Sequence, residues 1–391
     1  MKLKVFLVIF VIFSAAAFPA FANPETEQDE IIERQLQELN LETLERELEK
    51  LRTHDPHQVF FDYDLRDMIR GLRSGELSLD FRTLVNALLN TFFGEVMENL
   101  VLLGQVVILA GISALLQIII GSMEEKGISE LARGAIYLVV ILLLVSSLQN
   151  MMSLGQNTIA QMVSFMQALV PPLLTMLVGV GAVTSAAIFQ PLVFLGIVFL
   201  GGIIQNLILP VIFFSGILTL INGLKGKLDI SQLIKLLREG SSVVLGIVMV
   251  LFVGLIALQG AVGAIGDGLT LRTAKYLTGA FVPVVGSMFA DAVELIVSCS
   301  LLIKNALGIL GLLGIVVLAV YPVVKVLALV FIFKIAAAII QPLGEESLSE
   351  TLDQLGDMVM MIFVALSSVS IMFFVCLTVV IGMAIMVVML R

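Results

Sequence analysis

Charged residues are scarce in this 391-residue chain: they make up 14% of it, while hydrophobic residues make up 59%. Soluble domains carry about 25% charged residues, so the composition excludes an ordinary soluble protein. Tryptophan is absent, and only two cysteines and two histidines occur. The composition predicts an all-α polytopic membrane protein.

Catalytic motifs are also missing. The sequence has no nucleotide-binding glycine loop followed by Lys-Ser/Thr, and no pair of zinc-binding histidines on one helix face. His54 and His57 both precede the apolar region, so no serine or cysteine within that region has a histidine near it in sequence. Cys299 and Cys376 stand alone in apolar runs, as buried structural cysteines do. We therefore expect no enzyme, no metal site and no cofactor.

The acidic net charge of −9 belongs to one part of the chain. Residues 23–99 hold 18 acidic and 8 basic residues, whereas residues 100–391 hold 13 and 12. The apolar part is therefore nearly neutral, and nothing in the sequence indicates a basic nucleic-acid-binding surface.

The N-terminus is typical of a secretory signal peptide. Lys2 and Lys4 precede an apolar run, and the small-residue sequence "AFA" ends at Ala22, which predicts a signal peptide at 1–22. An uncleaved anchor is the alternative. Either one places the acidic region 23–99 outside the cytoplasm.

The extracytoplasmic region 23–99 is predicted to be helical and amphipathic. Between residues 29 and 52, apolar side chains recur every three or four residues, and a second such stretch follows Asp80. These stripes predict either a small hairpin that buries its own face or a docking surface for partner proteins.

Residues 100–391 are predicted to form the multi-pass membrane domain. We expect about eight transmembrane helices, since about 20 apolar residues are needed for each. The approximate apolar segments are 100–121, 134–152, 160–180, 186–204, 206–223, 241–263, 281–303, 305–323, 326–343 and 358–390. Several are interrupted by proline, at Pro171, Pro172, Pro191, Pro210, Pro283 and Pro322, and such breaks need cover from protein or water.

The segment 281–303 leaves two topologies open. If it spans the membrane, the acidic segment 344–357 lies in the cytoplasm. If it is re-entrant, 344–357 lies outside and Arg391 inside, which agrees better with the excess of basic residues usually found on the cytoplasmic side. The charge rule therefore favours a re-entrant 281–303.

Lys334 lies in the middle of an apolar segment, where an unpaired cation is costly. Asp291 and Glu294 share a helix face and are its expected partners, in an ion pair between helices. A conduction path and a lysine that reaches the interface are the alternatives. Nearby, Gly308, Gly311 and Gly314 recur every three residues, a pattern that predicts close packing between helices.

The segment "GDGLTLRTAK" (266–275) places polar residues between two apolar segments. Arg272 and Lys275 would lie on one side of a short helix, with Asp267 near its start. We expect this extracytoplasmic cationic turn either to contact another subunit or line a pore, or else to meet lipid phosphates.

Two blocks of the chain resemble a known family. They are "DGLTLRTAKYLTGAFVPVVGSMFADAVELIVSCSLLIKNALGILG" (267–311) and "KVLALVFIFKIAAAIIQPLG" (325–344). Both resemble blocks of the stage III sporulation protein AE family, and the similarity extends more loosely over about 100–391.

That resemblance implies a subunit of the channel apparatus built during endospore formation, located in the mother-cell membrane around the forespore. The implied partners are the other products of the same stage III operon, among them an ATPase, together with a forespore-membrane protein. The resemblance implies no catalytic residue. A self-sufficient secondary transporter is the alternative function, because broken helices and buried charges also occur in transporters.

Overall fold

The computed structural model describes residues 25–39, 41–54, 69, 71, 81–121, 126–223, 230–281 and 286–389. Within these ranges the chain is helical apart from short turns, and no strand occurs among them. The predicted signal peptide, residues 1–22, lies outside the described part of the chain.

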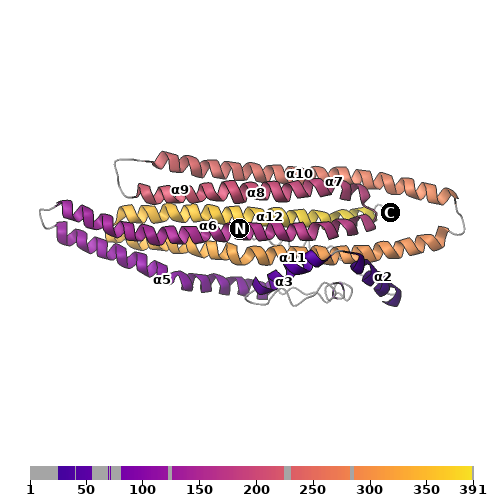
Figure 1. Cartoon of the computed structure of the whole chain (residues 1–391), viewed down its shortest axis with the longest axis horizontal. Helices are drawn as coiled ribbons and strands as arrows, with labels where there is room; N and C mark the ends of the chain where they lie inside the picture. The colour runs from indigo at the N-terminus through magenta and orange to yellow at the C-terminus, as the bar shows by residue number, and fades with distance from the viewer. Residues whose placement is uncertain are drawn as a thin grey trace.

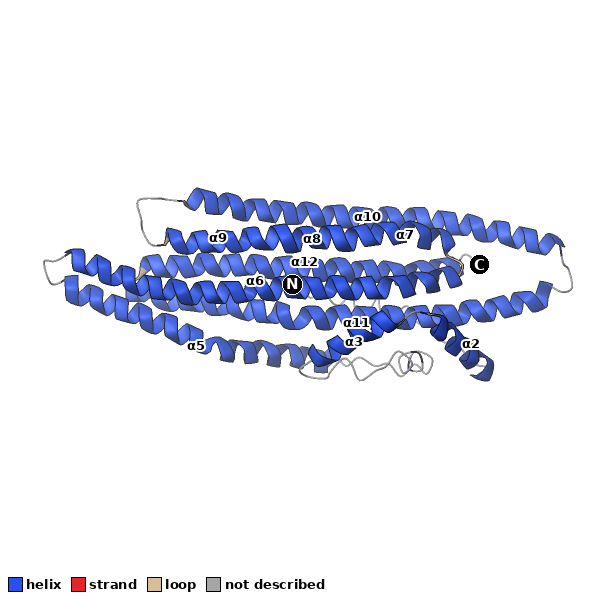
Figure 2. Ribbon diagram, viewed as in Figure 1, coloured by secondary structure: helices blue, strands red, loops and turns tan. Residues whose placement is uncertain are grey.

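The body of the molecule is a bundle of long helices that lie side by side along its longest axis (Figures 1 and 2). The long helices of the described part are α5 (Phe81–Gly121), α6 (Lys126–Gly179), α10 (Ser231–Phe281), α11 (Gly286–Ile340) and α12 (Glu346–Met389). Between α6 and α10 runs a composite helix of α7 (Val183–Leu195), η1 (Gly196–Leu200), α8 (Gly201–Ile203), η2 (Ile204–Ile208) and α9 (Leu209–Asn222).

Among the described residues, six helices are long and apolar enough to cross a membrane, against the eight or so that the sequence predicted. Their apolar parts are long: 46 residues in Gly134–Gly179 and 50 in Glu294–Leu343. At 1.5 Å per residue these parts extend about 69 and 75 Å, whereas a bilayer core is about 30 Å thick. Segments that the sequence separated are therefore joined into single helices.

The segments 134–152 and 160–180, which were expected to be separate, form one helix, α6. The expected segments left a boundary between residues 152 and 160, but its polar stretch at 155–157 lies in the middle of α6. Pro171 and Pro172 are also contained within α6. Asn and Gln only weakly disfavour a helix, and a helix that packs on several neighbours tolerates them.

Two glycines form turns between helices in the described part of the chain. Gly181, with φ of 96°, connects α6 to α7, and Gly344, with φ of 85°, follows η3 (Gln341–Leu343) and connects α11 to α12. Only glycine adopts this left-handed conformation without a steric penalty, which makes it the common residue after a helix end. We call the two ends of the bundle the Gly181 end and the Gly344 end.

The expected re-entrant segment 281–303 does not appear as such. Residues 286–303 form the first part of α11, which continues without interruption to Ile340. Arg238 near the start of α10 lies 2.9 Å from Asp357 of α12, so the start of α10 and the acidic segment 344–357 share the Gly344 end. This arrangement matches the alternative in which 281–303 passes through the bundle.

The N-terminal helices lie on the bundle. Helix α2 (Glu25–Glu38) packs on α11, and α3 (Glu42–His54) packs on α6 and α11. Ile32, Leu36 and Leu44 are buried in the same core cluster as the long helices, and the Gln35 amide donates to Ser300 Oγ at 2.9 Å. The apolar stripe of 29–52 thus covers the bundle, and its charged residues face outward.

Candidate functional site

A cluster of four charged residues lies near the Gly344 end. Lys334 Nζ is 2.6 Å from Asp353 Oδ1 and 2.8 Å from Asp357 Oδ1. Asp357 Oδ2 also lies 2.9 Å from Arg238 Nη1, so one carboxylate joins three helices. The Lys334 side chain is 37% exposed and that of Asp357 30% exposed.

The predicted partners of Lys334 were therefore wrong. Glu294 is exposed, on the part of α11 far from Lys334, and the side chain of Asp291 lies outside the described residues. Lys334 and Asp353 are brought together because the chain reverses at Gly344, nearly midway between them. A helical hairpin centred on "QPLG" could have been inferred from the proline and glycine there, and it would have identified both aspartates.

A second ion pair lies midway along the bundle, between α5 and α11. Lys325 Nζ is 3.2 Å from Glu95 Oε1 and 3.1 Å from Oε2, although only the Oε1 contact has the geometry of a hydrogen bond. The Glu95 side chain is only 5% exposed. Lys325 also lies 5.5 Å from the centroid of the Tyr321 ring and 3.4 Å from its hydroxyl. A paired and hydrogen-bonded charge is the form in which buried charges are tolerated.

At the same level, two glutamines join α6 to η2. Gln156 Nε2 donates to the Gln205 carbonyl at 3.4 Å, and Gln205 Nε2 donates to the Gln156 carbonyl at 3.2 Å. In η2 the Leu209 N–H bonds to the Ile204 carbonyl, five residues back. The next donor in that pattern would be Pro210, which has no N–H. Gln156 therefore supplies the hydrogen bond that the proline removes from Gln205.

These contacts belong to one central polar layer, defined by Glu95, Tyr321, Lys325, Gln156 and Gln205. Helices α6 and α11 are antiparallel, and a side chain at Gly314 would meet Phe165 while one at Gly179 would meet Ser300. Equal rise along both helices places 321–325 level with about 154–158. The layer coincides with the boundaries predicted between paired apolar segments, at 152–160, 204–206 and 323–326.

Lys304 is buried without a carboxylate near it among the described residues. It has no exposed surface, and its Nζ donates to the Ile381 carbonyl of α12 at 2.8 Å. The adjacent Asn305 Oδ1 is buried without a hydrogen-bond partner. Nothing in the local sequence indicated that Lys304 would bind a carbonyl on α12.

The three spaced glycines lie where α11 contacts α6 and α12. A Cβ at Gly308 would approach Ile381 to 2.4 Å, one at Gly311 would approach Leu169 to 2.2 Å, and one at Gly314 would approach Phe165 to 2.3 Å. Contacts this short require the neighbour to move. The absence of a side chain is thus what permits the close approach of these helices.

The cationic segment that contains Asp267, Arg272 and Lys275 is part of α10 rather than a turn between two spans. Positions 272 and 275 share one side of this helix. The side chains of these three residues lie outside the described part, so their role as subunit contacts or pore-lining groups stays a prediction.

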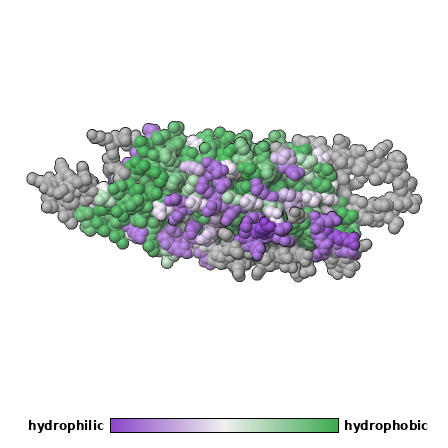
Figure 3. Space-filling model, in the orientation of Figure 1, coloured by the Kyte–Doolittle hydropathy of each residue, from purple (hydrophilic) through white to green (hydrophobic). Residues whose placement is uncertain are grey.

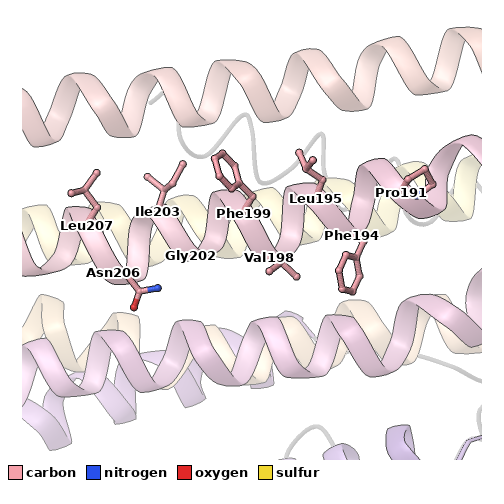
Figure 4. Close-up of a pocket in the computed structure, with 9 residues that line it drawn as sticks. All are labelled: Pro191, Phe194, Leu195, Val198, Phe199, Gly202, Ile203, Asn206 and Leu207. Carbon is pink, nitrogen blue, oxygen red and sulfur yellow. The ribbon is translucent and has the colours of Figure 1, made fainter.

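An apolar groove of about 700 Å³ follows the outer side of the composite helix from Pro191 to Leu207. Asn206 is the one polar side chain among the residues that line it. Figure 4 shows Phe194, Val198 and Asn206 on one side of the helix and Leu195, Phe199 and Leu207 on the other. The groove is open, and its lining suits lipid chains. No group of three or more metal-ligating side chains occurs among the described residues.

Apolar helices of this length, with ion pairs and amide pairs inside the bundle, define an α-helical multi-pass membrane protein. The family model for stage III sporulation protein AE matches residues 63–384. The chain is also 39% identical to the stage III sporulation protein AE of Bacillus subtilis (strain 168) over 308 residues, which are 79% of this chain and 77% of that protein. The chain belongs to the stage III sporulation protein AE family. No solved structure matches it.

Proposed function

We propose that this protein is a membrane subunit of the multiprotein channel apparatus that links the mother cell and the forespore during endospore formation, and that late forespore development requires it. The observation that carries the proposal is the family membership, because the match over 63–384 includes nearly the whole bundle. The partners in this proposal are other stage III proteins of the same operon, including an ATPase, and a forespore-membrane protein.

We further propose the orientation of the bundle in the mother-cell membrane. The Gly344 end carries Lys235 and Arg238, and in the sequence Lys225 and Lys227 precede them, which favours the cytoplasmic side. Helix α2 contacts Ser300, near the Gly181 end, as an extracytoplasmic N-terminal region would. The number of crossings is left to experiment, because α6 and α11 are each longer than one bilayer core is thick.

Cysteine accessibility in sealed cells tests this orientation. Single cysteines would replace Thr270 of α10 and the exposed Glu350 of α12, in a chain whose Cys299 and Cys376 have been replaced by alanine. We expect an impermeant maleimide added outside to label position 270 and not position 350. Labelling of both positions would instead support the topology in which 281–303 is re-entrant.

Deletion and complementation in a spore-forming host test the function. Without the protein we expect loss of late forespore gene expression and of heat-resistant spores, both restored by the wild-type chain. Copurification from sporulating cells should recover the ATPase of the operon. Normal late forespore expression in the deletion strain would refute the proposed role.

A self-sufficient secondary transporter is the second candidate. The observation that favours it is the central polar layer, where π-helical turns and a buried ion pair interrupt apolar helices, as at many transport sites. The purified chain in lipid vesicles separates the two functions. Substrate-dependent flux with this chain alone would support a transporter, whereas a channel subunit needs its partners.

A further inference from the structure

The outer side of α6 carries a seam of uncharged polar and small residues. Ser146, Asn150, Ser153, Asn157, Ser164 and Gln167 are all exposed on this helix, and so is Gln149 beside them. The opposite side of α6 is buried, with Met151 at 7%, Met162 at 0% and Phe165 at 1% exposure. Figure 3 shows hydrophilic residues across the middle of the viewed face, and more strongly hydrophilic ones in its lower part, where α2 and α3 lie in Figure 1.

The spacing along the seam is that of a coiled coil. Asn150, Asn157 and Ser164 follow one another at seven-residue steps, and Ser153 and Gln167 belong to the second series, with the half-exposed Ala160 between them. Two series of this kind, offset by three and four residues, are the contact positions of paired parallel helices. The exposed face of α10, by contrast, is lined by Val243, Ile247 and Val250.

The amide side chains of the seam also need hydrogen-bond partners. Among the described residues, no hydrogen bond joins the side chains of Asn150, Asn157 or Gln167 to any other residue. An amide exposed to lipid without a partner is costly, and between membrane helices such groups hydrogen-bond to one another while serine allows close approach.

We propose that the α6 seam binds the α6 seam of a second copy of this chain. All copies enter the membrane in the same orientation, so two α6 helices related by a two-fold axis run parallel, and each residue meets its own counterpart. Asn donates and accepts at once, which makes Asn150 against Asn150 and Asn157 against Asn157 self-complementary. The seam bears no charge, so neither contact brings like charges together.

Disulfide trapping in native membranes tests the contact on the full chain, with Cys299 and Cys376 replaced by alanine. The test positions are Ser153→Cys and Asn157→Cys. The matched control is Val243→Cys on α10, which is 61% exposed. Gly196 contacts Phe252 and Ser215 contacts Ile234, so Val243 lies level with about residue 205 and hence with Asn157.

We expect mild oxidation to produce a disulfide-linked dimer for both seam positions and none for Val243→Cys, because the Cα atoms must come within about 7 Å. Equal trapping at Val243→Cys would overturn the proposal, since it would show random collision. The absence of a dimer at both seam positions would also overturn the proposal. An impermeant maleimide would then distinguish two explanations: labelling would indicate that the seam faces water, and no labelling would indicate that another protein covers it.

A second variant measures the amide contacts. Asn150→Leu combined with Asn157→Leu should weaken self-association in detergent about ninefold, since each of the two asparagine pairs contributes roughly a factor of three. Undiminished self-association would show that the two asparagine pairs do not form, and it would overturn the proposed alignment of the two α6 helices. The channel role does not depend on this result, because a chain that fails to dimerise here could still complement a deletion strain.

Discussion

Lys304 and Lys334 lie on the same helix and are held in opposite ways. Lys334 is 37% exposed and is bound by two carboxylates of α12. Lys304 has no exposed surface and donates to one backbone carbonyl of the same helix. Both therefore join α11 to α12, one near the Gly344 turn and the other at the far end of the hairpin.

The difference indicates which contact contributes more to the stability of the α11–α12 hairpin. A partly exposed ion pair contributes little, because water already solvates both charges well. A buried contact has no such competitor, and its loss leaves a cavity or an unsatisfied group. We expect the contact without any carboxylate to matter more for folding than the cluster of charges, which was the more conspicuous feature.

The largest effect is expected at Lys304. Lys304→Ala should lower the free energy of unfolding by about 2–4 kcal/mol, because it removes a buried side chain together with its hydrogen bond to the Ile381 carbonyl. Lys304→Met, which keeps the packing of the stem, should lose less. Thermal unfolding in lipid nanodiscs measures both. A Lys304→Ala chain as stable as wild type would show that the buried Lys304 contact does not stabilise the hairpin more than the Lys334 cluster does.

Gly308, one turn from Lys304, meets the same residue of α12. Gly308→Ala places a Cβ 2.4 Å from Ile381 Cγ1, and we expect a loss of about 1–3 kcal/mol from overpacking. The matched control is Gly246→Ala on α10, where nothing lies within 4 Å of the added atom. The two variants should separate in the same unfolding assay, and similar stabilities would show that Ile381 moves aside freely.

At the other lysine, Asp357→Asn should cost about 1 kcal/mol, since Asp357 contacts Lys334 and Arg238 and is 30% exposed. It should also loosen the attachment of α10, which can be followed by limited proteolysis of the 223–230 connection. A loss as large as that of Lys304→Ala would mean that the charged cluster, and not the buried contact, holds the hairpin.

The smallest effect is expected for Asp353→Asn, within about 0.5 kcal/mol, because this carboxylate is 55% exposed and Lys334 keeps Asp357. Exchanging the two charges, with Lys334→Asp and Asp353→Lys together, should be worse than Asp353→Asn, because the aspartate introduced on α11 would face Asp357. Recovery to wild-type stability in the exchanged chain would show that Asp357 does not contact position 334.

Several features of the fold could be predicted from the sequence alone. The low content of charged residues defined a helical membrane protein, and the two long blocks identified the sporulation family. The spaced glycines at 308, 311 and 314 pointed to close helix contacts, because a glycine in an apolar helix leaves room for a neighbour to come near. Such properties depend on composition and on short-range periodicity, which the chain carries along its length.

Other features were decided only by the tertiary structure. The break expected near 155–157 is absent because α6 is supported by neighbours on several sides, and Gln156 bonds to Gln205 rather than ending the helix. The partner of Lys334 was misassigned because ion pairing depends on which helices are adjacent, and the turn at Gly344 determines that. Lys304 was overlooked because a backbone carbonyl leaves no mark in the sequence: every residue has one, and only the packing of α11 on α12 selects Ile381.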